Sequence, residues 1–239
     1  MKKTLILLFA VCAALASTSL SAAVKRTIVS ETRTLGKFNK INVGSVYDIE
    51  YTYSQEVSCV ISGENDFVKR TKLTIRQGTL FIELEPSKKS GNNNNDCGSL
   101  KIKLTGPEFQ GADISGVADF KLIGEFPKAP VELIISGASE FKGKINATSF
   151  DGNFSGTAEI VLSGQTPKAE MNICGTVELK AADFTTDDLK INISGTASAK
   201  IRVTKKLDAH TSGVSSLVYS GNPSQLNKVT EGLSTIDAI

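Results

Sequence analysis

The chain has 239 residues, with 27 lysines and arginines, 25 aspartates and glutamates, one histidine and no tryptophan. Its formal net charge is only +2 and the two signs are interspersed, which excludes the basic surface that nucleic-acid binding needs. Frequent Gly, Ser, Thr and Asn, without long Leu/Ala/Glu runs at helical spacing, are typical of a secreted all-β protein.

Residues 1–23 have the layout of a secretory signal peptide. Residues 2–3 are lysines, residues 5–15 are almost wholly apolar, and small residues suit cleavage after Ala23. The apolar run is shorter than the ~20 residues that span a bilayer, and no later stretch is apolar enough, so we expect no transmembrane segment in the mature chain. Cleavage would remove two lysines and leave equal numbers of basic and acidic residues.

Residues 24–110 are predicted to form a non-repetitive β region that continues directly into the second half of the chain. Apolar and polar residues alternate over residues 46–53 and 100–104, as in half-buried strands. Gln77-Gly78 separates two apolar runs and predicts a hairpin turn.

Three tyrosines alternate along one predicted strand of this region: Tyr47, Tyr51 and Tyr53. Alternate residues of a strand share a face, so the three rings lie together. They form an exposed platform for a surface partner, or they pack on the core or under the neighbouring Asn-rich loop. The platform is a candidate binding site because aromatic residues are enriched at binding surfaces.

Three cysteines remain after cleavage, an odd number for an oxidising compartment. Cys59 lies in an apolar run and Cys97 follows an Asn-rich loop, so a disulfide between them would tether that loop to a strand. Cys174 stands where most repeats have serine, and we expect a small buried thiol there. It has no neighbouring His or cation that would lower its pKa and make it reactive.

Residues 111–239 contain a repeated unit and then a C-terminal cap. A glycine preceded by Ser or Cys recurs at intervals of 18 to 21 residues: Gly116, Gly137, Gly156, Gly175, Gly195 and Gly213. Apolar residues recur before and after these glycines in two columns: Ile114, Ile135, Phe154, Ile173 and Ile193, then Phe120, Phe141, Ile160, Leu179, Ala199 and Leu217. A period of this length predicts stacked coils of short strands, about 4.8 Å per coil.

The predicted fold class is therefore all-β, a right-handed parallel β-helix or solenoid with coils of about 18–21 residues. Variable coil lengths favour this fold over the left-handed hexapeptide helix, which requires multiples of six residues. After residues 219–223 the repeat is incomplete, and we expect the remaining residues to cap the last coil.

A secretory leader, an alternating β region, repeats of the type Ile-Ser-Gly-x-Ala-Glu-Phe and a closing Tyr-Ser-Gly-Asn-Pro carry a family resemblance. The chain resembles, over about residues 33–225, the bacterial family labelled putative auto-transporter adhesin, head GIN domain. The resemblance implies a right-handed β-helix-like fold in secreted or envelope proteins, many of them from Bacteroidetes. It brings no established catalytic residues.

Four acidic residues occupy the same slot in successive repeats: Asp119, Glu140, Glu159 and Glu178. Stacked carboxylates could bind Ca²⁺ or act as a general acid and base, as on polysaccharide-cleaving scaffolds. Lysines follow two residues later in three of these repeats and can pair diagonally with the acids: Lys121, Lys142 and Lys180. We favour this structural interpretation and predict no metal, cofactor or catalytic residue.

Two other candidates lack the neighbours that chemistry requires. Asp187-Asp188 precedes a predicted strand and is interpreted as a solvated turn. His210 is the only histidine. It has no matching nucleophile and no metal-ligand spacing, so it is interpreted as a structural residue in the wall of a coil.

The sequence thus predicts an exported, non-enzymatic interaction protein of the periplasm or cell surface, an adhesin that presents a flat repetitive β face. Its partner would be an unidentified surface protein or glycan. One alternative is a polysaccharide lyase or hydrolase on the same scaffold, although only Arg202 among the arginines lies within the repeats. Another is a structural periplasmic protein without a ligand. Oligomeric state stays open.

Overall fold

The computed structural model describes residues 27–86 and 100–239. Fifteen strands and one short helix follow each other in these residues: β1 (Ile28–Arg33), β2 (Lys40–Val43), β3 (Val46–Tyr53), β4 (Ser58–Glu64), α1 (Asn65–Arg70), β5 (Thr71–Arg76), β6 (Thr79–Leu84), β7 (Leu100–Gly106), β8 (Gly111–Ile114), β9 (Val117–Ile123), β10 (Pro130–Ile135), β11 (Ala138–Asn146), β12 (Ser149–Thr211), β13 (Val214–Ser220), β14 (Gln225–Thr230) and β15 (Thr235–Ala238). Neither the predicted signal peptide nor Cys97 lies within the described residues.

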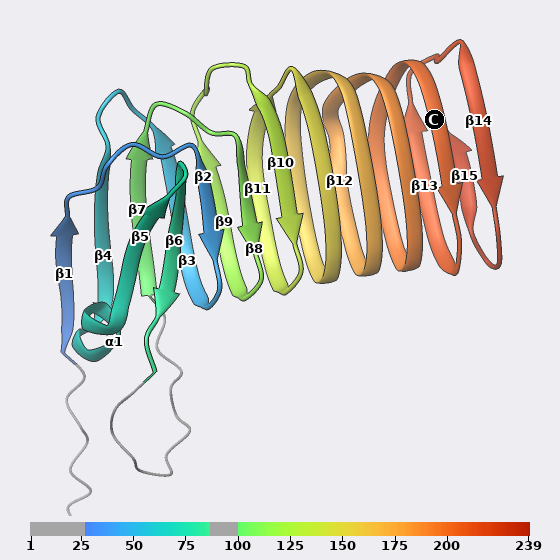
Figure 1. Ribbon diagram of the computed structural model, residues 1–239. Helices are drawn as coiled ribbons and strands as arrows, with labels where there is room; N and C mark the ends of the chain where they lie inside the picture. The colour runs from blue at the N-terminus through green and yellow to red at the C-terminus, as the bar shows by residue number, and fades with distance from the viewer. Residues whose placement is uncertain (1–26, 87–99) are drawn as a thin grey trace, which may run out of the picture.

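All fifteen strands belong to one sheet (Figure 1). Its strands pair side by side in two rows, which we call ladder 1 and ladder 2. Ladder 1 contains β5, β6, β2, β8, β10, part of β12 and β14, in that spatial order. Ladder 2 contains β1, β4, β7, β3, β9, β11, the rest of β12, β13 and β15. The ladders meet in β12, which is 63 residues long because the chain stays paired as it passes repeatedly from one ladder to the other.

Pairing within the ladders puts equivalent residues of successive repeats beside each other. Phe141 lies opposite Phe120 of the preceding repeat and Ile160 of the next. The rings of Phe120 and Phe141 are stacked, with centroids 5.5 Å apart and an interplanar angle of 15°. Both predicted apolar columns are buried, which confirms their assignment to the core. Each large side chain buried in this way contributes about 1.5–3 kcal/mol.

The prediction of a right-handed parallel β-helix with a non-repetitive N-terminal region is wrong. The described residues form a single mixed sheet, in which the pairs β1–β4, β4–β7 and β5–β6 are antiparallel. The predicted hairpin turn at Gln77-Gly78 is confirmed, because the chain reverses there between β5 and β6. In addition, β4 runs antiparallel to its neighbours on both sides, β1 and β7.

The N-terminal strands also share the ladders of the repeats. β2 pairs with β8 and β3 pairs with β9, both in parallel, across a separation of 71 residues. Gly44-Ser45 lies opposite Ser115-Gly116. The Ser-Gly pair between two strands of a repeat, which we call the corner, is therefore also present here, in the reverse order Gly-Ser. The long insertion and the exchanged order conceal this repeat in the sequence. The division of the chain at residue 110 stays a prediction.

The single helix of the described residues, α1, covers one end of ladder 2. It is six residues long and buries Phe67 and Val68, while Asn65, Asp66 and Lys69 are exposed. No helix in residues 27–86 and 100–239 is long and apolar enough to cross a membrane.

Candidate functional site

The predicted acidic column exists on the outer face of ladder 2. Glu140 lies directly opposite Asp119 and Glu159 in the neighbouring repeats. The column also extends into the N-terminal strands, because Asp48 of β3 lies opposite Asp119. Sequence analysis missed this extension because the two residues are separated by the insertion between β3 and β9.

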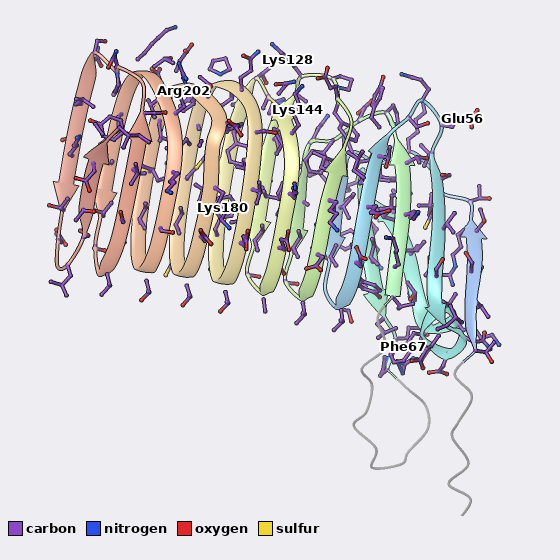
Figure 2. The ribbon with its side chains drawn as sticks, turned by 180° about the vertical axis from the view of Figure 1, so that it is seen from behind. Glu56, Phe67, Lys128, Lys144, Lys180 and Arg202 are labelled. Atoms are coloured by element: carbon purple, nitrogen blue, oxygen red, sulfur yellow. The ribbon has the colours of Figure 1, made fainter. Side chains whose placement is uncertain are left out.

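Lysine pairing along this column is confirmed at one position. Figure 2 labels Lys180 among the repeats. Its ammonium lies 2.7 Å from Glu159 Oε1, in the preceding repeat, and 3.3 Å from Glu178 Oε2. These hydrogen bonds, with Glu159 the stronger cause, raise the pKa of Lys180. Lys121 and Lys142 form no ion pair within the described residues. In the same part of the chain, no group of three or more His, Cys, Asp or Glu side chains is arranged to hold a metal.

A second charged cluster lies at the N-terminal end of the same face. The Lys101 ammonium is 2.8 Å from Glu50 Oε1 and 3.8 Å from Asp48 Oδ2, and Lys103 is 3.6 Å from Glu50. The hydrogen bond from Lys101 holds the pKa of Glu50 below its usual value, and the same bond raises the pKa of Lys101. Within the described residues, ion pairs along the acidic column therefore form two small groups, one around Lys180 and one around Glu50.

The three tyrosines of β3 share a face, but that face points into the molecule. Tyr47 and Tyr51 are 2% and 0% exposed, and only Tyr53 is partly accessible. The Tyr51 hydroxyl donates a 2.7 Å hydrogen bond to the Glu108 carbonyl, and burial raises its pKa above its ordinary value. The interpretation as an exposed platform is therefore corrected: the strand alternation places Tyr47 and Tyr51 in the core, on the same face as Ile49.

The cysteines occupy two different environments. Cys59 is fully buried, and burial raises the pKa of its thiol to about 11. Its predicted partner, Cys97, lies outside the described residues, so the disulfide stays a prediction. Cys174 is exposed, contrary to the buried thiol that we expected, because its corner position points outward.

The remaining sequence candidates lie apart from one another. Asp187 accepts a 2.6 Å hydrogen bond from Thr204 and lies 3.0 Å from the Lys205 ammonium; these contacts lower its pKa. His210 is exposed on ladder 1, where its Nε2 is 3.6 Å from Glu231. Among these contacts His210 has a carboxylate but no nucleophile beside it, and Asp187 has only a hydroxyl and an ammonium.

A row of side-chain amides on ladder 1 was missed. Asn172 donates a 3.0 Å hydrogen bond to Asn153, and Asn192 donates a 2.9 Å bond to Asn172. Asn153 in turn donates to Asp151 at 2.8 Å. We call these three asparagines the amide row. Its signal was an asparagine two residues before the Ser or Cys in three of the six repeats, in Asn-Phe-Ser, Asn-Ile-Cys and Asn-Ile-Ser.

A shallow groove on the same face of ladder 1 was also missed. It has a volume of about 310 Å³ and lies over β6, β2, β8 and β10. Its floor is Gly111 and Ala112, and Lys40, Asn42, Asp113 and Glu132 surround it. The four polar residues come from positions 40 to 132, so no local motif could reveal it.

Comparisons with known proteins agree with this architecture. The profile of the family described as putative auto-transporter adhesin, head GIN domain, matches residues 37–223. The crystal structure of a putative adhesin from Bacteroides fragilis NCTC 9343 is similar, with a TM-score of 0.81, 23% identity, and 89% of this chain and 97% of that chain covered. No curated protein matches the sequence.

Two further crystal structures have a similar fold. A putative adhesin from Parabacteroides merdae ATCC 43184 has a TM-score of 0.67 at 17% identity, covering 89% of this chain and 96% of its own. A structure described as a putative lipid binding protein, from Parabacteroides distasonis ATCC 8503, has a TM-score of 0.66 at 22% identity with the same coverage. At these identities the similarity concerns the fold alone.

Proposed function

The chain belongs to the family described as putative auto-transporter adhesin, head GIN domain, and from this membership we propose that it is a non-enzymatic interaction protein exported to the cell envelope or surface. Its partner would be a surface protein or glycan. The observation that carries the proposal is the alignment of outward polar side chains in columns across successive repeats.

Such columns suit repeated weak contacts better than a single reaction centre. Each repeat adds another copy of similar groups at the spacing of neighbouring strands, about 4.8 Å. A partner with repeated features can engage several copies at once, and linked weak contacts sum to a much stronger attachment. A rigid sheet also presents these groups without the entropy cost of ordering a flexible loop.

The ion pairs support binding rather than catalysis. Glu159 and Glu50 each accept hydrogen bonds from lysine ammonium groups. A general acid needs a carboxyl that holds a proton near the reacting atom, and an adjacent ammonium favours the ionised form instead. This arrangement favours the interaction role over the polysaccharide-cleaving alternative.

Attachment of living cells tests the proposal. Deleting the coding gene from the producing bacterium should reduce cell–cell aggregation or attachment to glycoprotein-coated glass. Supplying the gene again should restore the lost behaviour, which controls for effects on neighbouring genes. Equal aggregation and attachment with and without the gene would contradict an adhesive role.

A further inference from the structure

The groove on ladder 1 exists because one position in a column of side chains is empty. Lys40 and Glu132 both lie opposite Gly111, one on each side. A Cβ atom on Gly111 would lie 2.1 Å from the Glu132 carbonyl oxygen, and the residue has a φ of 152°. No other residue fits this backbone without displacing β10, so the gap is a fixed feature of the fold.

Four polar side chains surround this gap and form two hydrogen-bonded pairs. The Lys40 ammonium donates a 2.8 Å hydrogen bond to Glu132 Oε2, and the Asn42 amide donates a 2.9 Å bond to Asp113 Oδ2. Each pair keeps unused capacity, since an ammonium has three N–H groups, an amide has two, and each carboxylate has about four acceptor sites. The groove therefore offers both donors and acceptors whose orientation is already set.

Apolar surface completes the groove on both sides. Phe81 and Ile134 line it, and both are only partly buried although their neighbours in the groove on this outer face are polar. The guanidinium of Arg76, in β5, lies 5.7 Å from the centre of the Phe81 ring and makes a cation–π contact with it. The groove therefore places a partly accessible ring beside oriented donors and acceptors.

We propose that this groove binds a neutral sugar unit of a glycan, a ligand class that deepens the interaction role proposed above. A sugar ring has an apolar C–H face that can lie on Phe81 and hydroxyl groups that can bond to the two polar pairs. The volume of about 310 Å³ is at the small end of ligand sites and fits one or two rings. The two carboxylates are balanced by Lys40 in the groove and Arg76 at its edge, so the site has no excess positive charge to attract sulfated or sialylated sugars.

The test uses purified residues 24–239 and saturation-transfer NMR with defined probes. The neutral probes are mannotriose, lactose and triacetylchitotriose, and 3′-sialyllactose is the anionic comparison. At least one neutral probe should bind more tightly than the anionic one. Phe81→Ala, Asn42→Ala and Glu132→Gln should each weaken that binding about tenfold, the loss expected when a good polar or stacking contact is removed.

Matched variants on the same face separate the groove from the rest of the surface. Asn172→Ala and Glu170→Gln lie in ladder 1 outside the groove, and neither should change binding of the probe. Unfolding midpoints show which variants remain folded, and any one folded groove variant is sufficient for the test. Absence of binding by all neutral probes, or equal loss in groove and matched variants, would overturn the proposal. That result leaves the cell-attachment test untouched, so the two proposals can fail separately.

Discussion

The carbonyl oxygen of Gly156 lies 2.5 Å from the position that a Cβ atom on Gly175 would occupy. The two corners are in contact through their backbones, and Gly175 has a φ of 122°, which disfavours other residues. Gly175→Ala should therefore lower the free energy of unfolding by about 3 kcal/mol or more, through strain and displacement of the neighbouring repeat. Urea denaturation of the purified chain measures this loss.

Gly44→Ala is the matched control for this substitution. The nearest atom to a Cβ on Gly44 is Ser115 Oγ at 3.9 Å, which is ordinary contact. Its free energy of unfolding should change by less than about 1 kcal/mol. Equal losses in the two variants would show that close backbone stacking is not what requires the recurring glycines.

The amide row should contribute to stability through its cross-repeat hydrogen bonds. Asn172 both donates to Asn153 and accepts from Asn192, so Asn172→Ala removes two bonds. We expect a loss of about 1 kcal/mol in unfolding free energy. Asn222→Ala is the control, because Asn222 is exposed and has no side-chain hydrogen bond in the part of the chain that the structure describes. An unchanged midpoint in Asn172→Ala would contradict a stabilising row.

The Glu50 cluster predicts a specific dependence of stability on pH. The folded pKa of Glu50 lies below its usual value of 4.5, so its ion pairs stabilise the folded chain above pH 4.5. This contribution is lost as the pH falls through the folded pKa. Glu50→Gln should therefore unfold at lower urea than the wild type at pH 7, and the difference should shrink as the solution is acidified below pH 4.5.

Glu140→Gln tests whether this behaviour belongs to the ion pairs. Glu140 lies opposite Asp119 and Glu159 and forms no ion pair within residues 27–86 and 100–239. Removing its charge relieves repulsion between like charges, so the substitution should be neutral or slightly stabilising at pH 7. A loss similar to that of Glu50→Gln would contradict the assignment.

Alkylation followed by mass spectrometry tests the predicted disulfide. The mature chain, unfolded without reductant, should be labelled at Cys174 alone, and reductant should expose Cys59 and Cys97. In the folded chain with reductant, Cys174 should react before Cys59, because Cys174 is exposed whereas Cys59 is buried. Labelling of all three cysteines without reductant would show that Cys59 and Cys97 do not pair.

The sequence predicted the core columns well, because alternation and period act on neighbouring residues. It did not predict the mixed sheet, since the antiparallel pairing of β4 with β7 joins segments that lie far apart in the chain. Strand alternation placed Tyr47 and Tyr51 on one face, yet which face was inside depended on β7 and β9. The groove escaped prediction for the same reason: Lys40 and Glu132 meet only because Gly111 lies between them.

Protease shaving of intact cells tests the surface role most directly. Cells that produce the chain are treated with a protease that does not cross the envelope, and the chain is then detected in whole-cell samples. The account predicts that the chain is degraded while an internal marker protein stays intact. Protection of the chain until the outer membrane is broken would contradict its presentation at the cell surface.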